Sequence, residues 1–188
     1  MRLYSTIIGV CWIAFWLYWI ISAFGSKKGT RLNIRHFFVI RIALIVVAAT
    51  LFSTLNKQPY SFQNRTVTSN EPVLILGLIM FLAGLTLAVW ARIYLGKNWG
   101  MPMTQKKDPE LVTSGPYRYI RHPIYSGILL AALGSAFAAS IYWLLVFIIF
   151  AIYFIYSALV EEKLMMRQFP KVYPGYKSKT KMLIPFIL

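Results

Sequence analysis

The sequence predicts an all-α integral membrane protein with about five transmembrane helices, and two observations support this fold class. Hydrophobic residues make up 59% of the 188 residues and charged residues only 13%, whereas a soluble domain is about half apolar and about a quarter charged. Apolar runs near the ~20 residues that span a bilayer recur along the chain. Because only short polar loops separate these runs, we expect one domain, with three spans in residues 1–95 and a loop, a helical hairpin and a tail in residues 96–188.

The first predicted span covers residues 3–24, because no charged residue lies between Arg2 and Lys27. A cleaved signal peptide is the alternative, since residues 23–25 weakly resemble a cleavage site. The apolar run is too long and too aromatic for a signal peptide, and Arg2 alone makes a minimal basic segment before it. The pattern therefore favours a retained transmembrane helix.

Two further spans precede the longest polar stretch. The second covers about residues 36–55, and Arg41 lies near one of its ends, where a long side chain can reach the headgroups. The third begins after Pro72, which suits the first turn of a helix, and runs to about Leu95. Small side chains in this span would allow another helix to approach closely: Gly77, Ala83 and Gly84.

The C-terminal half contains two adjacent apolar runs. Residues 96–121 are polar, and runs over residues 123–139 and 141–160 follow, separated only by Ser140 and its neighbours. This spacing predicts a tight helical hairpin. The first run is short and rich in glycine and alanine, which suits burial between other helices. The tail from Glu161 onwards is basic and aromatic.

Lysine and arginine side chains predict the orientation of the chain. They concentrate in the first loop, the third loop and the tail, which a five-span topology places on one side, whereas the other side has only Arg2, Lys57 and Arg65. The basic side is normally cytoplasmic, so we expect an external N-terminus and a cytoplasmic C-terminus in a bacterial or archaeal inner membrane, or in the endoplasmic reticulum of a eukaryote. The bases are Lys27, Lys28, Arg31 and Arg35, then Lys97, Lys106, Lys107, Arg118 and Arg121, then Lys163, Arg167, Lys171, Lys177, Lys179 and Lys181.

The net charge of +15 is better explained by membrane lipids than by nucleic acid. The basic residues flank the apolar runs, where they contact anionic headgroups. Cys11 is the single cysteine and lies inside an apolar run, which excludes an internal disulfide and a thiolate metal cluster. We therefore predict no nucleic-acid partner and no metal site.

Two polar clusters contain the side chains suited to chemistry. In the first, over residues 111–127, Gly115-Pro116 turns the chain and begins a short helical segment. The cluster offers a guanidinium fork for a carboxylate, an imidazole, and aromatic faces with hydroxyls, in Arg121, His122, Tyr117 and Tyr125. Interfacial anchoring of the helix is the alternative explanation for these residues.

The second cluster begins with the adjacent carboxylates Glu161 and Glu162 at the predicted end of the last apolar run. Consecutive helical residues point about 100° apart, so we expect one carboxylate to face the bundle and the other to point outwards. Negative charge is unfavourable at a helix C-terminus. The pair therefore indicates that the helix continues or that the carboxylates have a positive partner, which a cationic ligand would provide.

Taken together, the two clusters resemble the isoprenylcysteine carboxyl methyltransferase family, whose integral membrane enzymes are similar to phospholipid methyltransferases. The matching pattern in residues 115–127 is Gly-Pro-Tyr, three residues, Arg-His-Pro, one residue, Tyr, one residue, Gly. The glutamate pair, the later aromatic residues and a closing Leu-Ile-Pro-Phe complete it: Glu161, Glu162, Phe169, Tyr173, Tyr176 and residues 183–186. The resemblance covers residues 96–188.

The resemblance implies methyl transfer from S-adenosylmethionine to a lipophilic acceptor, an isoprenylcysteine carboxylate or a similar lipid taken from the bilayer. It also implies a cytosol-facing C-terminal cofactor pocket, to which the hairpin returns Glu161 at the depth of His122. We predict Glu161 and Arg121 as catalytic residues and assign no general base. The predicted cofactor-binding residues are Tyr117, His122, Pro123, Tyr125, Glu161, Glu162, Tyr173 and Tyr176.

Three other functions remain open from the sequence. A phospholipid amine N-methyltransferase would use the same cofactor. An NADPH-dependent membrane reductase of a distantly related kind usually has more spans than this chain provides. A non-enzymatic lipid-binding membrane protein would use the basic loops alone. The sequence does not indicate an oligomeric state.

Overall fold

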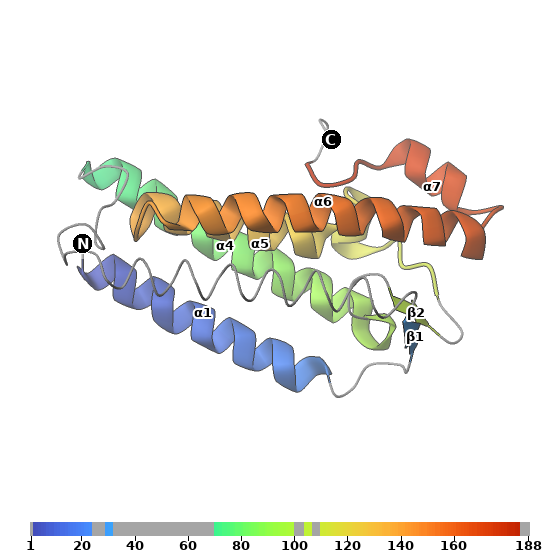
Figure 1. The fold of residues 1–188 in the computed structure, drawn as a ribbon, viewed down its shortest axis with the longest axis horizontal. Coiled ribbons are helices and arrows are strands. Elements are labelled where there is room, and N and C mark those ends of the chain that lie inside the picture. The colour runs from blue at the N-terminus through green and yellow to red at the C-terminus, as the bar shows by residue number, and fades with distance from the viewer. Residues whose placement is uncertain (1, 24–28, 32–69, 100–103, 107–109, 185–188) are drawn as a thin grey trace.

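The computed structural model describes residues 2–23, 29–31, 70–99, 104–106 and 110–184. Most of the described chain is helical, as the sequence predicted (Figure 1). The second predicted span, residues 36–55, and the end of the closing motif, residues 185–186, lie outside the described residues. The elements, in order, are α1 (Arg2–Ala23), β1 (Gly29–Arg31), α4 (Glu71–Leu95), η1 (Gly96–Asn98), β2 (Thr104–Lys106), η2 (Gly115–Arg118), α5 (Pro123–Ala138), α6 (Trp143–Gln168) and α7 (Tyr173–Lys179).

The long helices confirm an integral membrane protein. Three helical segments of the described chain are long and apolar enough to cross a bilayer: Leu3–Ser22, Glu71–Asn98 and Trp143–Gln168. The apolar helix α5 is shorter, with 16 residues, and most of its side chains are buried between its neighbours. The first, third, fourth and fifth predicted spans therefore all correspond to helices.

Helices α1 and α4 run in the same direction (Figure 1). At their beginnings the Tyr4 hydroxyl donates a hydrogen bond of 3.1 Å to Glu71 Oε1. At their ends Arg92 Nη2 donates to the main-chain oxygen of Ser22. Parallel helices at these positions are what the five-span prediction requires of the first and third spans.

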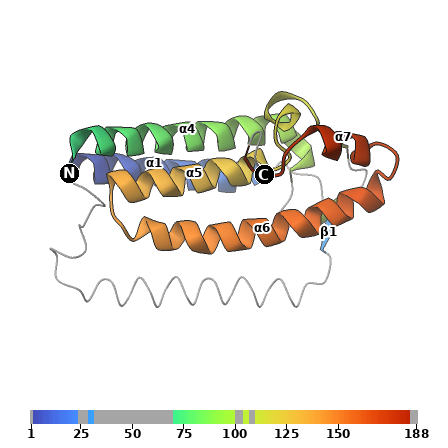
Figure 2. The same ribbon diagram turned by 90° about the horizontal axis from the view of Figure 1, so that it is seen from above.

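Glycines allow α4 and α5 to pack in backbone contact, and the two helices lie side by side in Figure 2. A Cβ atom added at Gly77 would lie 2.9 Å from the Gly134 carbonyl oxygen, and one added at Gly127 would lie 2.6 Å from the Gly84 carbonyl oxygen. Close backbone approach of this kind is typical of membrane helices, which gain association energy from packing. The prediction was correct for Gly77 and Gly84, whereas Ala83 is exposed.

Helices α5 and α6 form the predicted hairpin, joined by residues 139–142. The apolar run ends at residue 160, and α6 continues to Gln168, which confirms the alternative that the helix continues past the glutamate pair. Two side chains explain the extension. Leu164 is buried, and Glu162, which is also buried, has positively charged partners that remove the cost of a carboxylate late in a helix.

The three basic segments meet at one end of the bundle. Strand β1 in the first loop pairs antiparallel with β2 in the third loop, with Thr30 opposite Gln105. The tail joins the same region, where Ile120 and Lys181 form an isolated parallel bridge. The sequence predicted that these segments share one side, although it did not predict the two short strands or helix α7.

Candidate functional site

The candidate site lies where η2, the beginning of α5, the end of α6 and α7 come together. Gly115 has a φ of +58°, a left-handed conformation that glycine adopts readily. With Pro116 buried beneath the turn, this conformation directs Tyr117 into the interior. The second proline of the motif, Pro123, is buried in the first turn of α5, where its missing N–H removes no hydrogen bond.

A network of ion pairs holds α7 against α5 and α6. Arg121 Nε lies 2.6 Å from Glu162 Oε1, and Lys177 Nζ lies 2.7 Å from Glu162 Oε2. Arg121 Nη1 also donates to the main-chain oxygens of Lys177, at 3.2 Å, and Thr180. Both oxygens of Glu162 are therefore engaged, and Arg121 connects three segments of the chain.

Main-chain hydrogen bonds attach the tail to the entrance of α5. The amides of Arg121 and His122 donate to Lys181 O at 2.8 Å and Met182 O at 3.1 Å. One turn further along α5, Ser126 Oγ donates to Leu183 O. The tail thus forms one wall of the site.

His122 lies between the two adjacent glutamates. Its Nδ1 is 3.5 Å from Glu161 Oε2, and its Nε2 is 3.8 Å from Glu162 Oε1. The expectation that one carboxylate would point away from the bundle was wrong, because a flat imidazole with nitrogens on two edges can face both. Nε2 is buried and faces Glu162 Oε1 at a distance beyond that of a hydrogen bond.

The surroundings of His122 favour its protonated form. Burial alone would lower the pKa of His122, but the carboxylates of Glu161 and Glu162 outweigh burial and hold this pKa above its ordinary value of 6.5. An imidazolium between two carboxylates is a stabilising arrangement, and its contribution depends on pH.

We expect His122→Gln to lower the thermal stability of the detergent-solubilised protein most at about pH 6 and least at about pH 9. Because the folded-state pKa of His122 is raised, its stabilisation is complete below the unfolded pKa and is lost as pH rises through the folded pKa. Melting temperatures of wild type and variant across this range provide the measurement. Lys163→Gln, at an exposed neighbouring position on α6, should show a difference that does not change with pH. A constant gap for His122→Gln would contradict the expectation.

An aromatic stack connects His122 to the core, and its central ring, Tyr125, holds the carboxylate of Glu161 in place. The rings of His122 and Tyr125 are 5.3 Å apart with an interplanar angle of 2°, and those of Tyr125 and Phe154 are 4.5 Å apart with an angle of 8°. The Tyr125 hydroxyl donates a 2.6 Å hydrogen bond to Glu161 Oε1. The Glu161 side chain is 24% exposed and that of Glu162 only 5%, so Glu161 is the more accessible carboxylate.

Tyrosines from η2 and α7 form the remaining wall. The Tyr176 hydroxyl donates to Tyr117 O at 2.6 Å, and burial raises the pKa of Tyr176 to about 12, which keeps this donor protonated. Tyr173 is buried and meets the Tyr176 ring edge to face at 5.9 Å. Burial also raises the pKa of Tyr117 and Tyr173. All three phenols are therefore neutral at physiological pH.

The structure brings the predicted site residues into one cluster and adds others that the sequence reasoning missed. Phe154 lies seven residues before Glu161 on α6, a spacing that places both on one helix face and could have identified it. In the sequence, Lys177 is one of several basic residues of the tail, and Ser126 is a hydroxyl residue in a predicted helix. Their partners are distant in sequence, so no local pattern indicates their contacts.

The cluster combines an accessible carboxylate, a second carboxylate already neutralised by bases, and several neutral aromatic faces. Such a combination suits a ligand that carries positive charge and hydroxyl groups, since aromatic faces attract cations and a carboxylate accepts hydrogen bonds from hydroxyl or ammonium groups.

Comparisons with known proteins find similarities that include this region of the chain. A family model described as phospholipid methyltransferase matches residues 72–172. The protein-S-isoprenylcysteine O-methyltransferase of Saccharomyces cerevisiae is 30% identical over 170 residues, which cover 88% of this chain and 68% of the yeast protein. The matched residues include Arg121, His122 and both glutamates of the cluster.

Proposed function

This chain belongs to the phospholipid methyltransferase family and is a membrane methyltransferase for a lipophilic acceptor, and on that premise we propose that its methyl donor is S-adenosylmethionine, bound in the cluster around His122 and Glu161. The observation that carries the proposal is the position of Glu161. This carboxylate is partly exposed beside the stacked rings of His122 and Tyr125, and the Tyr125 hydroxyl fixes its orientation.

The residues of the cluster fit this donor. S-Adenosylmethionine carries a sulfonium, an ammonium, a carboxylate, a ribose diol and an adenine. Glu161 suits the ammonium or the ribose hydroxyls, and the half-buried ring of Tyr176 suits the adenine or the sulfonium. The protonated imidazole of His122 suits the donor's carboxylate. Tyr117, Pro123, Tyr125 and Tyr173 form the buried surroundings of these groups.

The donor supplies a methyl group bound to a sulfonium sulfur. When the acceptor's nucleophile bonds to the methyl carbon, the C–S bond breaks and the sulfur keeps its electron pair. The protein's own contribution is alignment and exclusion of water. Arg121 and Glu162 bond to each other and to the tail, so we assign them to positioning the wall of the pocket. Glu161 is the residue that we assign to direct contact with the donor.

For the acceptor we propose an isoprenylcysteine carboxylate. The yeast relative is named for action on protein S-isoprenylcysteine, and a carboxylate is already an anion at neutral pH, so it needs no general base. A phospholipid amine is the second candidate, which the description of the family supports.

We also propose that the cluster faces the cytoplasm. The paired strands β1 and β2, the end of α6 and helix α7 lie at one end of the bundle (Figure 1). The sequence concentrates its lysines and arginines in these segments, and the positive-inside rule places such segments on the cytoplasmic side. The N-terminus of α1 then lies on the external side.

Two measurements on the purified protein test this proposal. Isothermal titration should show binding of S-adenosylmethionine and no binding of NADPH. A labelled-methyl assay should then show transfer to a synthetic prenylcysteine in preference to phosphatidylethanolamine. Binding of NADPH alone would replace the proposal with a reductase, and transfer only to phosphatidylethanolamine would establish the amine as the acceptor.

A further inference from the structure

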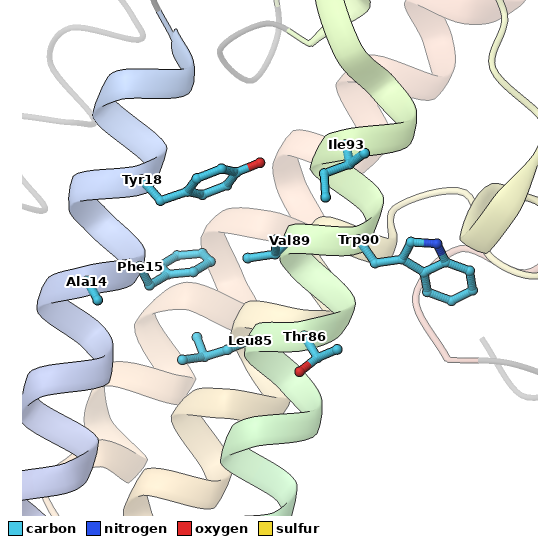
Figure 3. A pocket seen from close by; sticks show the side chains of 8 residues that line it. All are labelled: Ala14, Phe15, Tyr18, Leu85, Thr86, Val89, Trp90 and Ile93. Atoms are coloured by element: carbon cyan, nitrogen blue, oxygen red, sulfur yellow. The ribbon is translucent and has the colours of Figure 1, made fainter.

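An open groove lies between α1 and α4, with a volume of about 590 Å³. Phe15 and Tyr18 project from α1 towards α4, where Leu85 and Val89 face them (Figure 3). Ala14, Thr86, Trp90 and Ile93 complete its lining. The lining is almost entirely apolar, and its volume is within the range of ligand sites in proteins.

A buried arginine lies at the end of this groove. On α4, Leu85, Val89 and Arg92 are spaced by four and three residues, which places them on one helix face. On α1, Ser22 follows Tyr18 by one turn, and Arg92 Nη2 donates to the Ser22 main-chain oxygen. Arg92 is next to Ile93, which lines this end of the groove, and the end of α4 lies at the same end of the bundle as α7 (Figure 1).

Arg92 is a cation without an acidic partner among the described residues. It is 5% exposed. Its Nη1 donates to Gly96 O at 2.8 Å, its guanidinium carbon lies 4.7 Å from the centre of the Trp99 ring, and its Nε has no hydrogen-bond partner within the described chain. A buried charge is costly unless an opposite charge accompanies it, so this arrangement is suited to an anionic ligand.

The position of Arg92 also connects the groove with the candidate active site. Arg92 bonds to Ser22, one turn after the groove residue Tyr18, and α4 packs against η2, which carries Tyr117 of the cluster. The groove, the arginine and the donor cluster therefore follow one another along the bundle.

We propose that the groove and Arg92 form the acceptor site, in which the groove receives the hydrocarbon chain of the acceptor and Arg92 receives its carboxylate. This inference rests on the proposed function and adds to it where the acceptor lies. A single groove between two helices suits one hydrocarbon chain, whereas a phospholipid has two. The ligand chemistry is therefore a carboxylate on one long chain, as in a prenylated cysteine.

The location has a kinetic consequence. The charge of a carboxylate disappears as its oxygen bonds to the methyl carbon, so a guanidinium holds the acceptor more strongly in the ground state than in the transition state. Loss of such an interaction raises KM for the acceptor and does not lower kcat. A purely structural role for Arg92 would instead lower the yield of folded protein or the affinity for both substrates.

The test measures binding of an N-acylated S-prenylcysteine and of its carboxamide to the full chain in detergent, without the methyl donor. Arg92→Gln should weaken carboxylate binding at least about tenfold, as loss of a charged hydrogen bond does, and should leave carboxamide binding unchanged. Arg92→Lys should retain most of the affinity for the carboxylate. Ala14→Trp, at an exposed position in the groove, should weaken binding of both compounds, whereas Ala83→Trp, at an exposed position on α4 outside the groove, should affect neither.

Affinity for S-adenosylmethionine, which each of these variants should retain, reports on correct folding. Wild-type binding of the prenylcysteine by Ala14→Trp, or by a folded Arg92→Gln, would overturn the site. Displacement of the prenylcysteine by lower concentrations of phosphatidylethanolamine would overturn the choice of acceptor. Failure of the wild type to bind S-adenosylmethionine would refute the proposed donor while leaving the lipid measurements valid, so the two failures are distinguishable.

Discussion

Glu161→Gln should reduce labelled-methyl incorporation into the acceptor by a factor of about 100 or more, because a misplacement of about 1 Å in a transfer reaction costs that much. The substitution preserves the size of the side chain and one of its two accepting oxygens. It removes the negative charge beside His122 and the carboxylate that accepts the Tyr125 hydrogen bond. Rates at saturating concentrations of both substrates, together with the affinity for S-adenosylmethionine, are the required measurements.

The matched control is Glu71→Gln at the opposite end of the bundle, where Glu71 bonds to Tyr4 on the exposed surface. This variant should keep wild-type activity. Glu162→Gln provides a second comparison, because Glu162 bonds to Arg121 and Lys177 and its loss should loosen α7 and lower the melting temperature. Full activity in Glu161→Gln would exclude a direct role for this carboxylate.

Gly77→Ala should destabilise the bundle by about 1–3 kcal/mol, the usual cost of overpacking. The new Cβ would lie 2.7 Å from Phe137 Cβ and 2.9 Å from the Ala138 nitrogen. Backbone atoms cannot move aside as a flexible side chain can, so α4 and α5 must separate and lose contacts along their length. The substitution is far from the His122 cluster, so the free energy of unfolding, measured in mixed micelles with increasing denaturing detergent, reports on helix packing alone.

Gly9→Ala in α1 is the control for this substitution. A Cβ at Gly9 would meet nothing within 4 Å, and alanine has the higher helix propensity by about 1 kcal/mol. The same exchange should therefore be neutral or slightly stabilising in α1 and destabilising in α4. Equal effects at the two positions would show that the close contact between α4 and α5 does not contribute to stability.

The helices were predictable because their causes are local. Long apolar runs and the position of Pro72 fixed α1 and α4 to within a residue or two. The motif around His122 and the glutamate pair indicated which polar residues would gather, because a hairpin between them can only return the chain to the same depth.

The contacts within the site were not predictable to the same degree, because they depend on long-range partners. The end of α6 stayed open in the sequence, since the bases that neutralise Glu162 come from the residues just before α5 and from the tail. Arg92 was not predicted to be functional, because it lies near the end of an apolar run. A charged residue within a span is nevertheless by itself an indication of function. Its importance depends on Ser22, 70 positions away in the sequence.

The attachment of the tail to the entrance of α5 also has a consequence for biogenesis. Arg121 reaches Thr180 across 59 positions and Ser126 reaches Leu183 across 57. Helices emerge from the ribosome in order and can enter the bilayer one after another, but the wall next to His122 exists only after Leu183 has been translated. A nascent chain halted before that point would be inserted in the membrane and inert, so the enzyme should gain its activity in a single late step.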